Sequence, residues 1–201
     1  MKKFLLLSLI IVLTKIYAQD QIFKSKQLTF YGLDFTNAQF IGTFGFNQKA
    51  KIQDFHFPDW NYMFEKERRK YNLSDAFRMK QINYDFSIVN KRNSEFDIYE
   101  KISDEDFDTE LGEEDIRPIL KAYANPNHKG LGLLMVVESM SYFKNLAVVW
   151  LCFFDSETGD SYLIKRIRGE AGGLNFRNWW ARSFYNVLES AKLNYPYWIK
   201  S

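Results

Sequence analysis

The sequence predicts a single-domain α+β protein with a mixed, largely antiparallel sheet packed by helices. Two observations carry this prediction. The apolar run 146–154 is followed by the polar residues 155–160 and by the alternating segment 161–168, a pattern typical of an antiparallel hairpin. Residues 177–193 then place apolar side chains at helical spacing. No internal repeat, linker or low-complexity segment divides the chain, so one domain is the simplest account.

The other elements follow from hydrophobic periodicity and turn residues. Strands are expected at residues 28–35, 39–46, 83–89, 131–140, 146–154 and 161–168, and helices at 59–71, 113–123 and 177–193. Asp59, directly after Pro58, is expected to cap the first helix. Residues 90–93 are predicted to form a loop, and the glycine-rich residues 169–173 connect the last strand to the last helix. With 18% aromatic residues, a core rich in rings is expected.

The first 18 residues predict export. Lys2 and Lys3 precede a short run of mostly Leu and Ile, and Ala18 is a small residue before polar Gln19, as in a secretory signal peptide. The run is shorter than the about 20 residues of a membrane span. We expect cleavage near Ala18, a periplasmic or secreted mature domain over residues 19–201, and no membrane span. Because position 19 is not cysteine, no lipid anchor is expected.

The charge balance argues against a nucleic-acid partner. Of the 27 Lys and Arg residues, Lys2, Lys3 and Lys15 lie in the signal segment, which leaves 24 against 25 acidic residues. A protein that binds nucleic acid usually carries a strong and clustered positive charge. Nucleic acid is therefore not expected as a partner. Because export is predicted, the expected partner is an envelope protein or an envelope ligand.

Residues with nucleophilic or metal-binding side chains are few. Cys152 is the only cysteine, which excludes an intramolecular disulfide, and its apolar neighbours predict a buried structural thiol. The two histidines, His56 and His128, are isolated from each other in the sequence and assigned to loops. With one cysteine and two isolated histidines, a Cys/His zinc cluster is excluded. The sequence lacks the Gly-x-Ser-x-Gly motif that is typical of serine hydrolases.

The glycine-rich loop before the last helix is the best candidate for a binding surface. Glycines allow backbone N–H groups to converge, and a helix start with nearby arginines favours anions. Adjacent helical residues point about 100° apart, so at most one of Trp179 and Trp180 faces the core. The alternative is a plain strand-to-helix connection that only glycine fits. The candidate partner- or ligand-binding residues are Gly172, Gly173, Arg177, Asn178, Trp179 and Arg182.

An acidic stretch offers a calcium alternative. Asp104, Asp106 and Asp108 occupy positions 1, 3 and 5 of a twelve-residue loop. However, Thr109 stands where the sharp turn needs glycine, and Asp115 replaces the long bidentate Glu. A solvated acidic loop leading into a helix is the competing interpretation, and no other cofactor is expected.

Three segments carry a resemblance to known proteins. Residues 150–159, 168–173 and 176–181 resemble uncharacterised secreted proteins of Bacteroidota-type bacteria. The hairpin and glycine loop are more distantly similar to envelope accessory proteins of the curli-secretion lipoprotein and penicillin-binding-protein activator type, and residues 31–37 resemble their first strand. The resemblance implies a mixed sheet backed by helices and an envelope location. The chain departs from the activator type because it lacks the lipid-bearing cysteine.

Together these observations predict an exported, non-enzymatic envelope protein that binds another protein or an envelope ligand. Two alternatives stay open at this stage. One is a hydrolase that acts on an extracellular polymer through carboxylates that the sequence does not identify. The other is a calcium-assisted binding module that uses the acidic stretch.

Overall fold

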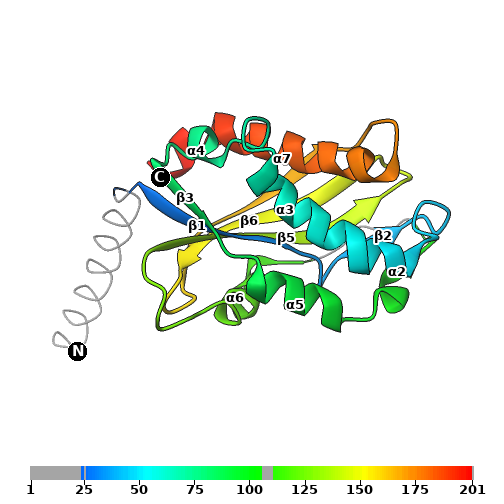
Figure 1. The fold of residues 1–201 in the computed structure, drawn as a ribbon, viewed down its shortest axis with the longest axis horizontal. Coiled ribbons are helices and arrows are strands. Elements are labelled where there is room, and N and C mark those ends of the chain that lie inside the picture. Colours follow the sequence, from blue (N-terminus) through cyan, green and yellow to red (C-terminus); the bar gives the residue numbers. More distant parts are fainter. Residues whose placement is uncertain (1–23, 25, 106–110, 201) are drawn as a thin grey trace, which may run out of the picture.

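A computed structural model describes residues 24, 26–105 and 111–200, which form a single domain of mixed helices and strands (Figure 1). The predicted signal peptide, residues 1–18, lies outside the described residues. The strands are β1 (Gln27–Asp34), β2 (Gln39–Ile41), β3 (Gln81–Tyr84), β4 (Ile102–Ser103), β5 (Leu131–Ser141), β6 (Leu146–Asp155) and β7 (Ser161–Glu170). The helices are α2 (Lys49–Lys51), the π-helix η1 (Ile52–His56), α3 (Phe57–Lys66), α4 (Leu73–Ala76), α5 (Ser87–Glu95), the 3₁₀ helix η2 (Ile98–Lys101), α6 (Glu113–Lys121) and α7 (Phe176–Trp198).

The prediction of a largely antiparallel sheet is wrong. β1 and β2 both pair with the same edge of β5, β1 along its first half and β2 at its end. β3 pairs with the other edge of β1, and β4 with the other edge of β2. These four pairings are parallel, and only β5–β6 and β6–β7 are antiparallel. The sheet is curled rather than flat. The sequence pattern suggested hairpins because strands next to each other in sequence often pair, but parallel pairing requires the long helical crossovers that this chain contains.

Helices cover both faces of the sheet (Figure 1). Neighbouring residues of β1 point to opposite faces: Phe30 packs on Phe64 of α3, and Tyr31 packs on Tyr123, just after α6. β5 is buried along its whole length. α7 lies beside α3, where the indole nitrogen of Trp60 donates to the Arg177 carbonyl at 3.0 Å. The predicted core rich in aromatic rings is confirmed by these contacts and by many fully buried rings.

One glycine is required inside β1. The register between β1 and β5 shifts between Phe30 and Gly32, and Gly32 has a φ of +103°. A Cβ at this position would lie 2.6 Å from the side-chain oxygen of Asn61. Glycine therefore permits both the backbone angle and the close approach of Asn61, whose oxygen accepts a hydrogen bond from the Leu33 N–H at 2.6 Å.

Most of the predicted elements are present, but the strand predicted at residues 83–89 is wrong. β3 ends at Tyr84, and the Asp85 carboxylate accepts hydrogen bonds from the backbone and hydroxyl of Ser87, which begins α5. The residues predicted to form a loop at 90–93 are therefore helical. The alternation was too short to distinguish a strand from a capped helix start. Likewise, β2 stops at Ile41, short of the predicted residue 46, and β7 continues to Glu170.

Candidate functional site

The helix that builds the site begins ten residues before the predicted start. α2, η1 and α3 form one continuous helical run, so Asp59 lies inside a helix and does not cap it. Pro58 has no N–H for the carbonyl one turn earlier, which accounts for a wide turn directly ahead of it. In that turn the Phe57 N–H donates to the Ile52 carbonyl, the bond of a π-helix. Single π-turns inside α-helices are rare and occur frequently at functional sites.

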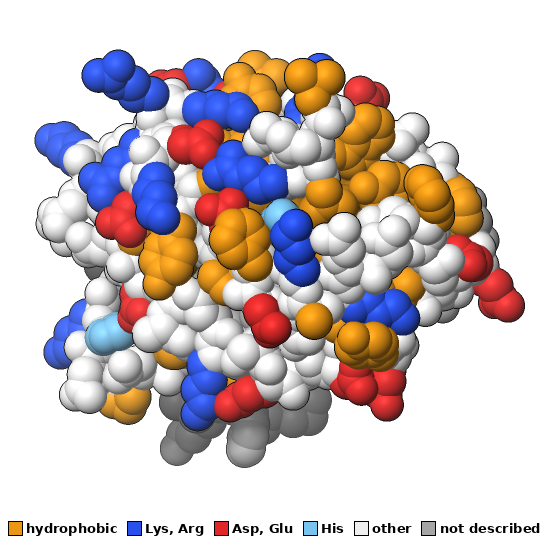
Figure 2. Space-filling model, turned by 45° about the vertical axis from the view of Figure 1, so that its right-hand side comes forward, with side chains coloured by type: hydrophobic (Ala, Val, Ile, Leu, Met, Phe, Trp, Pro, Cys, Tyr) orange, Lys and Arg blue, Asp and Glu red, His pale blue; other side chains and the backbone are white. Residues whose placement is uncertain are grey.

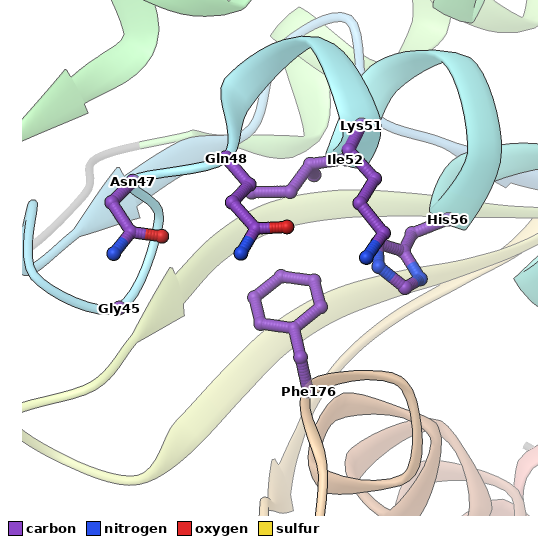
Figure 3. Close-up of a pocket in the computed structure, with 7 residues that line it drawn as sticks. All are labelled: Gly45, Asn47, Gln48, Lys51, Ile52, His56 and Phe176. Atoms are coloured by element: carbon purple, nitrogen blue, oxygen red, sulfur yellow. The ribbon is translucent and has the colours of Figure 1, made fainter.

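A pocket of about 160 Å³ lies between this helical run and the first turn of α7. Figure 3 shows the amide side chains of Asn47 and Gln48 on one side, Lys51 and His56 on the other, and the ring of Phe176 entering from α7. Its lining residues are Gly45, Asn47, Gln48, Lys51, Ile52, His56 and Phe176. Two chain segments more than a hundred residues apart therefore build one site.

His56 is the most unusual group in this pocket. Its side chain is only 7% exposed, and its ring packs against Phe176 at 4.8 Å and Trp60 at 5.6 Å between ring centroids. Its Nδ1 is buried and has no hydrogen-bond partner among the described residues. Such an unsatisfied buried polar atom costs about 1–3 kcal/mol.

The surroundings of His56 favour the neutral imidazole. Burial lowers the pKa of His56 below its usual value, and the positive charges of Lys51 and Arg177 lower it further, whereas Asp59 opposes them. A neutral imidazole offers one donor nitrogen and one acceptor nitrogen. The pocket therefore presents an uncharged, two-way hydrogen-bonding group beside a cation.

The charge of the pocket is positive. Of the seven described residues that line it, Lys51 is the only formally charged one, and none is Asp or Glu. The Lys51 ammonium forms no ion pair with the described residues, and Gln48 does not use its side chain to cap the helix that it precedes. These polar groups are available to a ligand.

Exposed hydrophobic side chains are sequence neighbours of the pocket residues. Phe44 is 91% exposed beside Gly45, and Phe55 is 58% exposed beside His56. Figure 2 shows the side of the molecule that carries α2 and β2, where hydrophobic side chains form patches between lysine and arginine side chains. An apolar surface next to a polar pocket is typical of a binding site.

Five of the six residues that the sequence predicted as a binding site lie together in a second hollow, separate from the His56 pocket. Gly172, Gly173, Arg177, Asn178 and Arg182 line a broad, open hollow of about 530 Å³. Trp179 does not line it; its ring stacks on Tyr142 at 6.2 Å, while Trp180 is fully buried. At most one of the two tryptophans was expected to face the core; Trp180 lies inside it, but Trp179 is half-buried and also packs against it.

Arg177 lines this hollow but is held by ion pairs. Its guanidinium contacts the Asp59 carboxylate at 2.8 Å and the Glu67 carboxylate at 2.7 Å. These bonds join α7 to α3 and its C-terminal cap, so the main task of Arg177 is structural. Arg182 is exposed and forms no ion pair with the described residues.

The structure gives the calcium prediction no support within the described residues. Asp106 and Asp108 lie outside them. The carboxylate of Asp104 accepts hydrogen bonds from the backbone and hydroxyl of Thr43, which lower its pKa. The described part of the chain contains no cluster of three metal-ligating side chains.

The sequence interpretation missed the His56 pocket because it placed His56 in a loop. The available signal was the four-residue spacing of Ile52, His56 and Trp60 across Pro58. All three side chains are buried. This spacing indicates a helix that continues through the proline.

Comparisons with protein-family models, curated proteins and solved structures find no match to this chain. The resemblance to Bacteroidota-type secreted proteins and envelope accessory proteins therefore stays a prediction. Over the residues that the structure describes, no helix has the length and apolar content that crossing a membrane requires.

Proposed function

We propose that this protein is an exported binding protein whose ligand site is the His56 pocket. One observation carries the proposal: His56 lines a pocket, and the buried Nδ1 of its imidazole has no hydrogen-bond partner among the described residues. Most buried polar groups in folded proteins are hydrogen-bonded, so a ligand group that reaches this nitrogen is expected to supply a hydrogen bond that the described residues do not. The export part of the proposal rests on the signal-like first 18 residues.

The pocket supports binding better than it supports hydrolysis. Glycoside hydrolysis needs two carboxyl groups that face each other across the substrate, and the lining residues within the described part of the chain include no Asp or Glu. A cation, two amides and a neutral imidazole instead recognise and orient a ligand.

Histidine NMR tests this proposal directly, because the chain contains only two histidines. His128 lies on the other side of β1, near the hydroxyl of Tyr31, and serves as an internal reference. We expect fragments from a chemically diverse library to shift the ring signals of His56 and to leave those of His128 in place.

A blocking variant sharpens the test. Asn47 is exposed at the pocket wall, so Asn47→Trp is expected to fill the opening without disturbing the core and to abolish the shifts of His56. Asn194→Trp, at an exposed position near the other end of α7, is the matched control. No shift of His56 with any fragment, or equal shifts in the Asn47 variant, would overturn the proposal.

The hollow at the start of α7 supports a second candidate function, the docking of an envelope protein. Leu174 is fully exposed in this hollow, at 103%, between Gly173 and the start of α7. A pull-down from envelope fractions is expected to lose its partner with Leu174→Ser or Arg182→Ala. Arg177→Ala is unsuitable for this purpose, because it also removes the ion pairs to α3.

A further inference from the structure

We propose that the His56 pocket takes a small carboxylate that carries one flat ring. This inference rests on the proposed function and adds the chemical class of the ligand. It follows from the size of the pocket, the distribution of its polar groups and the nature of its apolar wall.

The volume limits the ligand to about one ring. The pocket measures about 160 Å³. An apolar protein cavity of about 150 Å³ is large enough for one benzene molecule, whereas drug-sized ligands need pockets of about 300–1,000 Å³. A dinucleotide or an oligosaccharide does not fit inside.

The polar groups select a negative charge. Lys51 supplies a positive charge at the wall, and none of the lining residues that the structure describes is an Asp or Glu that would repel an anion. The side-chain amide groups of Asn47 and Gln48 are directed toward the same space (Figure 3). The pocket also adjoins Phe176, the first residue of the 23-residue helix α7, where the helix dipole favours an anion.

The apolar wall favours a flat group. Phe176 packs against both His56 and Trp60, at 4.8 Å and 5.8 Å between ring centroids. Aromatic rings attract one another in tilted or offset arrangements beyond the effect of buried area alone. A ligand ring placed against Phe176 extends this aromatic cluster.

The carboxylate is expected to lie between Lys51 and His56, whose side chains are adjacent in Figure 3. There it accepts charge-assisted hydrogen bonds from the ammonium and from the imidazole. The charged groups that act on His56 come from three elements: Lys51 from α2, Asp59 from α3 and Arg177 from α7. A bound anion adds one negative charge to this set, so binding is expected to strengthen as pH falls and His56 takes up a proton.

Three probes separate the ring of the ligand from its charge. Benzoate has both, benzamide has the ring without the charge, and acetate has the charge without the ring. Dissociation constants are measured from the His56 signals. We expect benzoate to bind about tenfold more tightly than either of the others, which corresponds to one charge-assisted hydrogen bond or one buried ring face. Equal affinity of benzamide and benzoate would overturn the charge assignment, and equal affinity of acetate would overturn the ring.

A charge-matched pair of variants locates the anion contact. Lys51→Met is expected to remove the preference for benzoate over benzamide. Lys49→Met removes the same charge from the same helix, but its ammonium lies over the ring of Tyr99 at 4.7 Å, so the preference is expected to persist. A preference that survives in Lys51→Met would overturn the inference.

The outcomes also separate this inference from the proposed function. If library fragments shift His56 but none of the three probes does, the ligand class is wrong and the binding site stands. If neither the library nor the probes shift His56, the proposed function itself fails.

Discussion

The guanidinium of Arg177 lies 2.8 Å from the carboxylate of Asp59 and fastens the start of α7 to α3. Both side chains are about one quarter exposed, at 27% each, and Arg177 also contacts Glu67. Arg177→Ala leaves two partly buried carboxylates without their partner, so we expect unfolding to become easier by about 1–2 kcal/mol. Urea denaturation measures this change.

Arg182→Ala is the control for this prediction. It removes an arginine from the same helix and the same hollow, but an exposed one without an ion pair to the described residues. A surface change of this kind stays within about 0.5 kcal/mol. Equal stability of the two variants would show that the Arg177 ion pairs contribute nothing.

The buried side-chain amide of Asn93 forms hydrogen bonds with the backbone at the C-terminal end of β1. Its oxygen accepts from the Phe35 N–H at 2.8 Å, and its nitrogen donates to the Leu33 carbonyl at 2.8 Å. Asn93→Ala leaves both backbone groups unpaired in the core, so we expect a loss of roughly 2–4 kcal/mol. Thermal and urea unfolding check this value, with Ser94→Ala on the exposed side of α5 as the control. A loss no larger than that of the control contradicts this role for Asn93.

The part of the fold that was predictable from sequence is the part governed by local chemistry. β5, β6 and β7 lie within two residues of their predicted bounds, because long apolar strands joined by short turns fix their own pairing. The parallel pairing of β1 with β5 joins residues about a hundred positions apart, such as Thr29 and Gly132. Hydrophobic alternation predicts that β1 is a strand, but it does not predict which strand pairs with β1.

For the hollow beside α7 and for the His56 pocket, local sequence patterns likewise did not predict which residues are in contact. The glycine loop was predicted to form a binding surface, which stays a prediction; the acids that hold Arg177 are 118 and 110 positions away in the sequence, so its ion pairs were not predictable. His56 was missed because Pro58 usually marks a helix start, whereas here a π-turn lets the helix pass through it. The partners of both side chains are set by tertiary packing.

Cys152 is expected to resist thiol reagents in the folded protein. It is fully buried in β6, and burial raises the pKa of its thiol, so almost no reactive thiolate is present at neutral pH. Ellman's reagent is expected to react only when urea unfolds the chain. Because the sequence has a single cysteine, the signal has one source. Rapid reaction of the native protein would contradict the burial of this thiol.

The stability of the protein is expected to fall as pH drops below about 6.5, because of His56. Burial and then Lys51 hold the pKa of His56 below its unfolded value, so the unfolded chain binds the proton more readily than the folded one. The contribution is fully present above the unfolded pKa and is lost as pH falls toward the folded pKa. Urea unfolding between pH 5 and pH 7.5 is expected to show this slope in the wild type, and His56→Gln is expected to flatten it. An unchanged slope in the variant would assign the pH dependence to other groups.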